Sequence, residues 1–286
     1  MKRLLILIFC INVMITFKSE AQVSLLWEND SITNNPESIV YDDIRQCCYV
    51  SNFGRSPANG MTYNEDYVSK FNLKGELLER KFVSNLTAPT GLCLLNDKLY
   101  IVERFGIVKY DLEQNKVETR FRINSTKFLN DVAVDSDENI YVTASDTNII
   151  YRIKDAKVEE WVGSALTKNP NGIICDGDKI IVGICSDNTV KSITIADKKI
   201  TKIAKLGTES GVIDGIKKYG NDYLVSHYQG IIYQVHSDGQ FFEILNTTKE
   251  GIFCADFEFI ESQRLFVIPT LRNNRVAVYK FQTGIK

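Results

Sequence analysis

Residues 130–162 read NDVAVDSDENIYVTASDTNIIYRIKDAKVEEWV and contain four short apolar segments, at 131–135, 140–144, 149–153 and 158–162. The separators between these segments are rich in Asp, Ser and Asn, the residues that form tight turns. β-Branched and aromatic residues occur in the segments, as is typical of strands, and no helical period of ten or more residues runs through them. The stretch therefore predicts one antiparallel unit of four strands.

The same pattern recurs along the chain as an internal repeat. In each of six units one residue begins a first apolar strand, and these residues are Glu37, Thr90, Asn130, Asn171, Asp214 and Ala255. Successive members lie 53, 40, 41, 43 and 41 positions apart, and an insertion at 54–66, rich in Gly, Asn, Ser and Pro, explains the long first interval. Four strands in a repeat of about 40–45 residues are typical of propeller blades. The sequence therefore predicts an all-β protein with the fold of a six-bladed β-propeller.

The two ends of the chain indicate how the ring closes. The last unit shows only three clear strands, at 256–260, 265–268 and 275–281. We expect residues 23–28 to supply the missing outer strand, because an incomplete blade would expose an unpaired edge. Residues 22–286 then form a single propeller domain, and an open solenoid is the alternative.

Composition limits the classes of partner. The chain has 286 residues, 44% of them hydrophobic, with 34 Lys and Arg against 36 Asp and Glu, for a formal net charge of −2. A chain without basic excess is poorly suited to neutralise phosphates, so we expect no nucleic-acid partner.

The N-terminus predicts export. Met1-Lys2-Arg3 precedes an uncharged apolar run from residue 4 to 17, and Ser19-Glu20-Ala21 offers small residues for a cleavage site. This pattern is typical of a secretory signal peptide, here residues 1–21, and the run is short for a membrane span. We expect a periplasmic or extracellular protein without a membrane span after signal removal; an uncleaved N-terminal anchor is the alternative.

Export permits disulfides among the six remaining cysteines, yet their positions favour mostly free, buried thiols. Cys47 and Cys48 are adjacent in one strand and point to opposite faces, while Cys93, Cys175 and Cys254 lie in apolar stretches. No CxxC pair occurs, which excludes zinc ribbons and thioredoxin-like motifs.

The residues that begin the repeats are candidates for a metal site. The first strand of a propeller blade lines the central channel, so these side chains converge at one end of the axis. Glu37 and Asp214 offer carboxylates, and Asn130 and Asn171 offer neutral oxygens, a set that suits a hard divalent cation. Asn and Asp at strand entries also commonly satisfy backbone groups in turns, which is the structural alternative.

These motifs resemble those of the gluconolactonase, regucalcin and luciferin-regenerating enzyme family of six-bladed propellers. The resemblance covers roughly residues 30–280 and is carried by Pro36-Glu37-Ser38, Leu129-Asn130-Asp131, Pro170-Asn171-Gly172 and Ile213-Asp214-Gly215. It implies that Glu37, Asn171 and Asp214 hold one divalent cation, with Ca²⁺ the first choice and Mg²⁺, Mn²⁺ or Zn²⁺ as alternatives. It also implies that Asn130 contacts substrate and that the substrate is a sugar lactone or a related ester.

One position departs from the family pattern. Characterised sugar lactonases have a basic residue two positions before the Asn-Asp pair, where this chain has Phe128. An apolar wall in place of a polar contact predicts a substrate less polar than gluconolactone. We expect the ends of the second strands to surround the same channel mouth and form its rim. Two rim residues, Arg104 and His227, are predicted to contact the substrate. The other rim residues are Asn52, Phe53, Glu103, Asp146, Asp187, Tyr228 and Arg272. The insertion at 54–66 starts from this rim, where it could act as a lid.

Two classes of function follow from these residues. The first is an exported metal-dependent hydrolase of a lactone or small ester, in which the cation polarises the carbonyl and Asp214 orients or deprotonates a water. No nucleophile elbow or Cys/His pair indicates a covalent intermediate. The second is a non-catalytic exported propeller that binds a ligand or a protein, with a structural metal ion.

Overall fold

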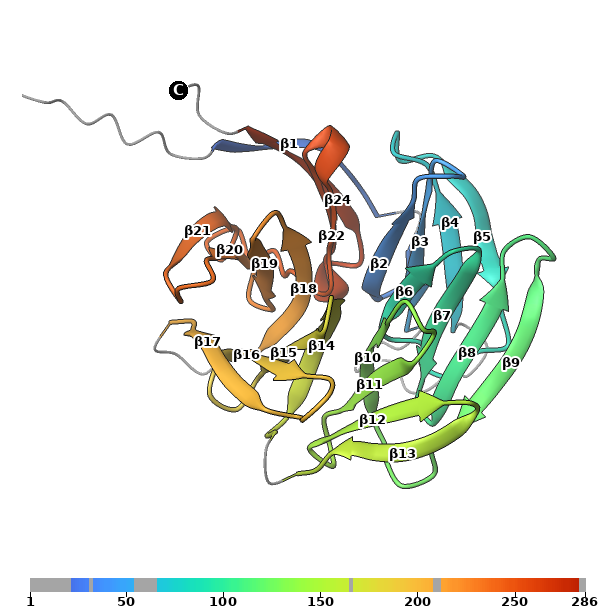
Figure 1. Cartoon of the computed structure of the whole chain (residues 1–286). Coiled ribbons are helices and arrows are strands. Elements are labelled where there is room, and N and C mark those ends of the chain that lie inside the picture. Colours follow the sequence, from blue (N-terminus) through green and yellow to red (C-terminus); the bar gives the residue numbers. More distant parts are fainter. Residues whose placement is uncertain (1–21, 31–32, 54–65, 165–166, 208–211, 283–286) are drawn as a thin grey trace, which may run out of the picture.

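The structure is a computed structural model that describes residues 22–30, 33–53, 66–164, 167–207 and 212–282. Six four-stranded antiparallel sheets surround a central axis in the described residues, which confirms the predicted six-bladed β-propeller (Figure 1). The expected signal peptide at 1–21 and residues 54–65 of the expected lid lie outside the described residues.

The first three blades contain the strands that the repeat predicts, and each sheet follows chain order from the axis outward. Blade 1 contains β2 (Pro36–Asp42), β3 (Cys47–Asn52), β4 (Tyr67–Phe71) and β5 (Leu77–Val83). Blade 2 contains β6 (Leu92–Leu95), β7 (Lys98–Glu103), β8 (Gly106–Asp111) and β9 (Lys116–Arg122). Blade 3 contains β10 (Leu129–Val134), β11 (Ile140–Ala144), β12 (Ile149–Lys154) and β13 (Lys157–Val162).

The next two blades repeat this order, and the last blade departs from it. Blade 4 contains β14 (Pro170–Asp176), β15 (Lys179–Ile184), β16 (Thr189–Thr194) and β17 (Ile200–Lys205). Blade 5 contains β18 (Ile213–Tyr219), β19 (Asp222–His227), β20 (Ile231–Val235) and β21 (Phe241–Asn246). Blade 6 contains β22 (Glu258–Ile260), β23 (Leu265–Pro269), β24 (Val276–Gln282) and the N-terminal strand β1 (Gln22–Asn29).

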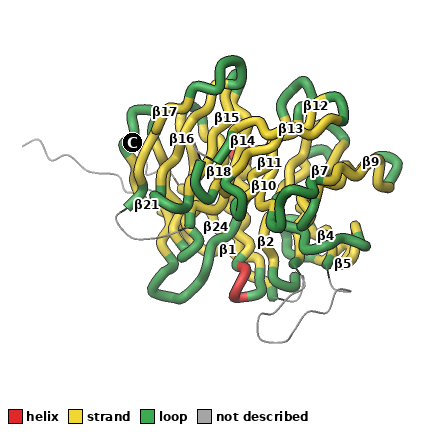
Figure 2. Tube along the Cα trace, turned by 90° about the horizontal axis from the view of Figure 1, so that it is seen from below, coloured by secondary structure: helices red, strands yellow, loops and turns green. Residues whose placement is uncertain are grey.

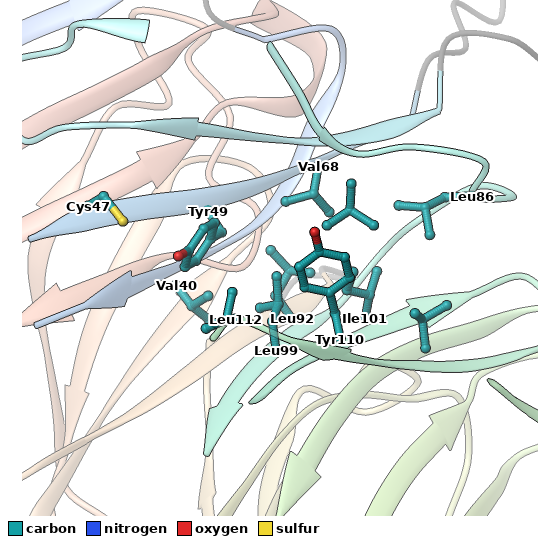
Figure 3. Packing of buried hydrophobic residues seen from close by; sticks show 12 residues of the cluster. Val40, Cys47, Tyr49, Val68, Leu86, Leu92, Leu99, Ile101, Tyr110 and Leu112 are labelled. Atoms are coloured by element: carbon teal, nitrogen blue, oxygen red, sulfur yellow. The ribbon is translucent and has the colours of Figure 1, made fainter. Parts of the chain in front are cut away.

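The hydrophobic core is divided into six clusters, one between each pair of neighbouring blades. Strand side chains alternate between the two faces of a sheet, so each blade contributes to two clusters. Between blades 1 and 2, for example, Val40 and Tyr49 pack against Leu99, Ile101 and Tyr110 (Figure 3). Burial between blades therefore stabilises the ring as a whole.

The adjacent cysteines show this alternation directly. Cys47 belongs to the cluster shared with blade 2, whereas Cys48 belongs to the cluster shared with blade 6. All six cysteines of the described chain are free, four of them buried and two, Cys93 and Cys175, half-buried.

Strand β1 closes the ring in the predicted way. It pairs antiparallel with β24, from Gln22 opposite Gln282 to Asn29 opposite Val276, and forms the outer strand of blade 6. Its side chains also reach blade 1, because the Trp27 indole donates to the Leu73 carbonyl oxygen (3.0 Å). The N-terminal strand thus connects the last blade to the first.

Strands make up the body of the molecule and loops gather at its two ends (Figure 2). The described residues contain two short 3₁₀ helices, η1 (Glu261–Gln263) and η2 (Leu271–Asn273), both in blade 6. Neither helix in this part of the chain has the length and apolar character that crossing a membrane requires.

We predict that deletion of residues 22–29 from a chain that begins at residue 22 lowers the free energy of unfolding by several kcal/mol, on the scale of lost packing and an exposed edge. A finer test is Trp27→Ala, which removes the ring that packs on Phe71 at a centroid distance of 6.4 Å and should cost about 2 kcal/mol. Leu26→Ala, at a side chain that is 53% exposed, is the matched control and should change stability by less than about 0.5 kcal/mol. Denaturant melts that coincide for the deletion variant and the chain that begins at residue 22 would contradict closure by β1.

Candidate metal site at the channel mouth

Four inner strands are irregular at the position that was expected to face the channel. Their pairing with the second strand shifts between Pro36 and Ile39, Leu129 and Val132, Pro170 and Ile173, and Ile213 and Ile216. Each irregular segment contains one predicted site residue, namely Glu37, Asn130, Asn171 or Asp214. The four side chains are 8%, 8%, 5% and 6% exposed. Thr90 and Ala255, at the equivalent places of the other two blades, are buried as well.

Hydroxyl groups of the second strands stabilise three of these irregular segments. The backbone N–H groups of Ser38, Asp131 and Gly215 would lose their ladder partners at such a shift. They donate instead to the hydroxyls of Ser51 (2.9 Å), Thr143 (3.0 Å) and Ser226 (2.7 Å), respectively. In each of the three segments, the hydrogen bond fixes the backbone immediately after the residue that faces the channel, and so helps to position that residue.

Hydrogen bonds connect the candidate residues of neighbouring blades. Asn171 Nδ2 donates to Asp214 Oδ1 (3.2 Å), which joins blade 4 to blade 5. Asn130 Nδ2 donates to Ser145 Oγ (3.2 Å), and this hydroxyl donates to the Pro170 carbonyl oxygen (2.7 Å), which joins blade 3 to blade 4. Both amide N–H₂ groups are therefore used within the ring, and their carbonyl oxygens stay available.

Three oxygens at this mouth are buried without a hydrogen-bond partner among the described residues: Glu37 Oε2, Asn130 Oδ1 and Asn171 Oδ1. A buried polar atom left unpaired costs about 1–3 kcal/mol, so its place in a folded protein needs an explanation. Carboxylate and amide oxygens are ligands that Ca²⁺ and Mg²⁺ accept. A bound hard cation would satisfy these oxygens, and the donor set fits one.

The channel also carries more negative than positive charge. Burial raises the pKa of Glu37 well above its usual value, and the nearby Asp214 carboxylate raises it further. Burial, followed by the charge of Asp256, raises the pKa of Asp214 to about 8. The Lys217 ammonium, 3.6 Å from Asp256 Oδ1, offsets part of this charge from deeper in the channel. A divalent cation near Glu37 and Asp214 would offset more of it.

The donor set is rich in amides. Among the described residues, no three His, Cys, Asp or Glu side chains gather in a metal-binding group. A cation at this mouth would therefore depend on the amide oxygen of Asn171 in addition to the carboxylates of Glu37 and Asp214. Such a mixed oxygen set suits Ca²⁺ better than Zn²⁺, which prefers nitrogen and sulfur.

The expected substrate contacts occupy three different settings. His227 ends β19 opposite Ile213 and is buried next to the Asp214 segment. Phe128 is half-buried on the approach to β10, where its backbone N–H donates to Thr126 Oγ1 (3.2 Å). The Arg104 guanidinium lies 5.8 Å from the ring centroid of Phe105 in its own turn. These placements leave the roles of the three residues as predictions.

Sequence reasoning missed two groups of residues near Asp214. The Cys185 thiol donates to the Ile213 carbonyl oxygen (3.3 Å), and the Asp214 charge raises the pKa of both Cys185 and Cys254, after burial as the main cause. The Phe253 ring packs against the Tyr228 ring in a tilted arrangement, with ring centroids 5.1 Å apart. Neither Phe253 nor these cysteines begin a repeat or end a second strand, so the repeat pattern carried no signal for them.

A pocket of about 310 Å³ occupies a different part of the channel. It is lined by residues of the inner strands, among them Cys93, Asp131, Cys175, Lys217 and Glu258. The four candidate site residues are not part of this lining. The mouth site and the deeper pocket are thus separate regions of one channel.

We predict that the cation-free protein loses stability as the pH rises from about 4 to 8. The folded-state pKa of Asp214, about 8, lies above its ordinary value of 3.8, so the folded chain keeps a proton that the unfolded chain releases in this window. Asp214→Asn should flatten the decline, and Asp178→Asn, at an exposed turn, should not. Thermal melts in chelator at several pH values check this; equal slopes in wild type and Asp214→Asn would contradict it.

Comparisons with known proteins agree on the fold. No protein-family model and no curated protein sequence matches the chain. Among solved structures, a gluconolactonase from Xanthomonas campestris matches with a TM-score of 0.71 and 15% identity, covering 92% of this chain and 90% of that one. A catalytically inactive virginiamycin B lyase from Staphylococcus aureus with quinupristin matches with a TM-score of 0.65 and 14% identity, covering 91% and 99%. The chain therefore resembles gluconolactonase and virginiamycin B lyase structures in fold.

Proposed function

We propose that the protein is an exported, divalent-metal-dependent hydrolase of a lactone or small ester, with its site at the channel mouth. The observation that carries the proposal is the set of buried oxygens without hydrogen-bond partners on Glu37, Asn130 and Asn171, beside the Asp214 carboxylate. Two of the similar folds belong to a gluconolactonase and a virginiamycin B lyase, which supports an enzyme of this architecture.

Each residue has a defined part in the proposed reaction. Glu37, Asn171 and Asp214 would hold the cation, which would supply a Lewis acid for the acyl carbonyl. Asp214 orients a water molecule and accepts its proton, while the amide of Asn171 fixes the orientation of the carboxylate through the 3.2 Å hydrogen bond. Asn130 and Phe128 contact the substrate from blade 3.

Burial of the site contributes to catalysis. The side chains of Glu37, Asn130, Asn171 and Asp214 are more than nine-tenths buried, and second-strand hydroxyls fix the backbone in three of their four segments. Oriented groups in such a setting act more strongly on developing charge than the same groups in water, because they need little reorganisation.

The first test is cation binding. Calorimetry on chelator-treated protein should show one Ca²⁺ or Mg²⁺ site, and Asp214→Ala or Glu37→Gln should weaken binding by about 100-fold or more, beyond the usual loss for an indirect partner. Asp178→Asn, which removes an exposed carboxylate at a turn, should bind as the wild type does. Circular dichroism of each variant separates lost binding from lost folding. Unchanged affinity in Asp214→Ala would rule out the site.

The second test is turnover. We expect hydrolysis of at least one member of a panel of sugar lactones, aliphatic lactones and aryl esters, assayed with Ca²⁺, Mg²⁺, Mn²⁺ and Zn²⁺. Phe128 predicts a preference for substrates less polar than gluconolactone. Asp214→Ala should reduce kcat by about 10²- to 10⁴-fold, the range for a lost general base, and Asn130→Ala should change the substrate preference.

Product analysis distinguishes the alternatives. A hydrolysed lactone gains the mass of one water, whereas a ring opened by elimination keeps its mass, so mass spectrometry separates a hydrolase from a lyase. Activity that persists in Asp214→Ala would exclude the mechanism. Absence of turnover on every substrate despite confirmed cation binding would favour the non-catalytic propeller with a structural metal ion.

A further inference from the structure

Three side chains form a cluster at the mouth on the side of blades 5 and 6: Tyr228, Phe253 and Arg272, the Arg272 cluster. Arg272 Nε donates to the Tyr228 hydroxyl (2.9 Å). Its guanidinium carbon lies 5.7 Å from the Tyr228 ring centroid and 5.3 Å from that of Phe253. The two rings therefore hold the guanidinium on an aromatic surface.

Backbone and side-chain hydrogen bonds hold this cluster in place. The Cys254 N–H donates to the Tyr228 carbonyl oxygen (3.1 Å), and the Phe253 N–H donates to Asn273 Oδ1 (3.0 Å). Asn273 Nδ2 also donates to the Gly251 carbonyl oxygen (3.1 Å). Arg272 lies between β23 and β24 in η2, so it projects from a turn that is tied to the blade 5–6 connection.

The cluster lies beside the candidate metal site. Tyr228 follows β19, and its backbone N–H donates to the carbonyl oxygen of Val212 (2.8 Å), two residues before Asp214. The charges of Asp214 and Glu37 both contribute to raising the pKa of the Tyr228 phenol, after burial, whereas Arg272 lowers it. The phenol thus accepts a hydrogen bond from Arg272 and is near enough to Asp214 and Glu37 to sense their charges.

The guanidinium of Arg272 keeps donors available for a ligand. It is exposed, and within the described residues its Nη groups form no hydrogen bond or ion pair. By contrast, the guanidinium groups of Arg45, Arg120, Arg152 and Arg275 are all paired with carboxylates. An arginine held on aromatic rings with open Nη groups is suited to bind a planar anion through two parallel hydrogen bonds.

We propose that the Arg272 cluster binds an anionic substituent of the substrate, which makes the substrate an acidic lactone or ester. This inference rests on the proposed function, because the scissile acyl group would lie at Glu37, Asn171 and Asp214. Phe128 belongs to blade 3, opposite blade 6 in the ring of six. The site would therefore combine an apolar wall on one side with a cationic one on the other.

Matched substrates that differ only in charge test the proposal. γ-Butyrolactone-3-carboxylate is compared with its carboxamide, and a phosphorylated sugar lactone with its neutral parent, so that carboxylate and phosphate are distinguished. Wild type should prefer the anionic member of at least one pair. Arg272→Gln should lower kcat/KM for that member by about 10-fold, the scale of a lost charge-assisted hydrogen bond, and change the neutral member by less than about twofold.

Two further variants test whether the positive charge of Arg272 causes the preference for the anionic substrate. Arg272→Lys keeps the charge and should retain part of the preference. Arg122→Gln removes an exposed positive charge from β9 and should retain all of it, which controls for the overall charge of the protein. Equal losses for the charged and neutral substrates in Arg272→Gln would show a structural role and overturn the proposal.

A binding measurement separates this inference from the proposed reaction. Calorimetry with cyclopentanecarboxylate and its methyl ester, on protein saturated with Ca²⁺, needs no turnover. Selective binding of the carboxylate, lost in Arg272→Gln, would support the anion site. If no lactone were hydrolysed as well, the proposed function would fail and the anion site would stand. Equal binding of acid and ester, or carboxylate binding unaffected by Arg272→Gln, would overturn the inference.

Discussion

The inner strands of six blades share one axis, and their backbones approach each other there more closely than most side chains allow. A Cβ atom on Gly172 would lie 1.9 Å from the Asp214 carbonyl oxygen, and one on Gly215 would lie 2.3 Å from Asp256 Oδ1. The position after each channel-facing residue therefore holds either glycine or a short polar side chain that bonds to a neighbouring blade. Ser38 is such a side chain, because its hydroxyl donates to Asp256 Oδ2 (2.5 Å).

Because of this crowding, four inner strands begin with a shifted register, and this shift forms the candidate metal site. A shifted register lets the residue before the glycine or short polar side chain turn into the channel, where Asn171 and Asp214 meet at 3.2 Å. The backbone groups that lose their ladder partners are satisfied by hydroxyls such as that of Ser226, but several side-chain oxygens at the axis are not. Their burial is costly without a cation and favourable with one.

The rim of the channel mouth is formed by turns, whereas the residues at the axis belong to the inner strands. Its residues lie in turns after the second strands, where a side chain can change without disturbing the packing between blades. Arg272 and Phe253 are nevertheless positioned by Asn273, so this part of the rim is ordered enough to select a ligand. The same ring can thus accept different substrates through its turns, which is why a shared fold does not define a shared reaction.

The sequence by itself determined the blades, because strand length, turn chemistry and a repeat of about 40 residues are local properties. It also singled out Glu37, Asn130, Asn171 and Asp214, since equivalent repeat positions must converge on one axis. Only the tertiary structure decided which oxygens are left without partners, because that depends on bonds between blades, such as the one from Ser145 to Pro170. The repeat placed Tyr228 and Arg272 after second strands at the rim, but their contact with each other and with Phe253, which lies in the connection between blades 5 and 6, was decided by the tertiary structure.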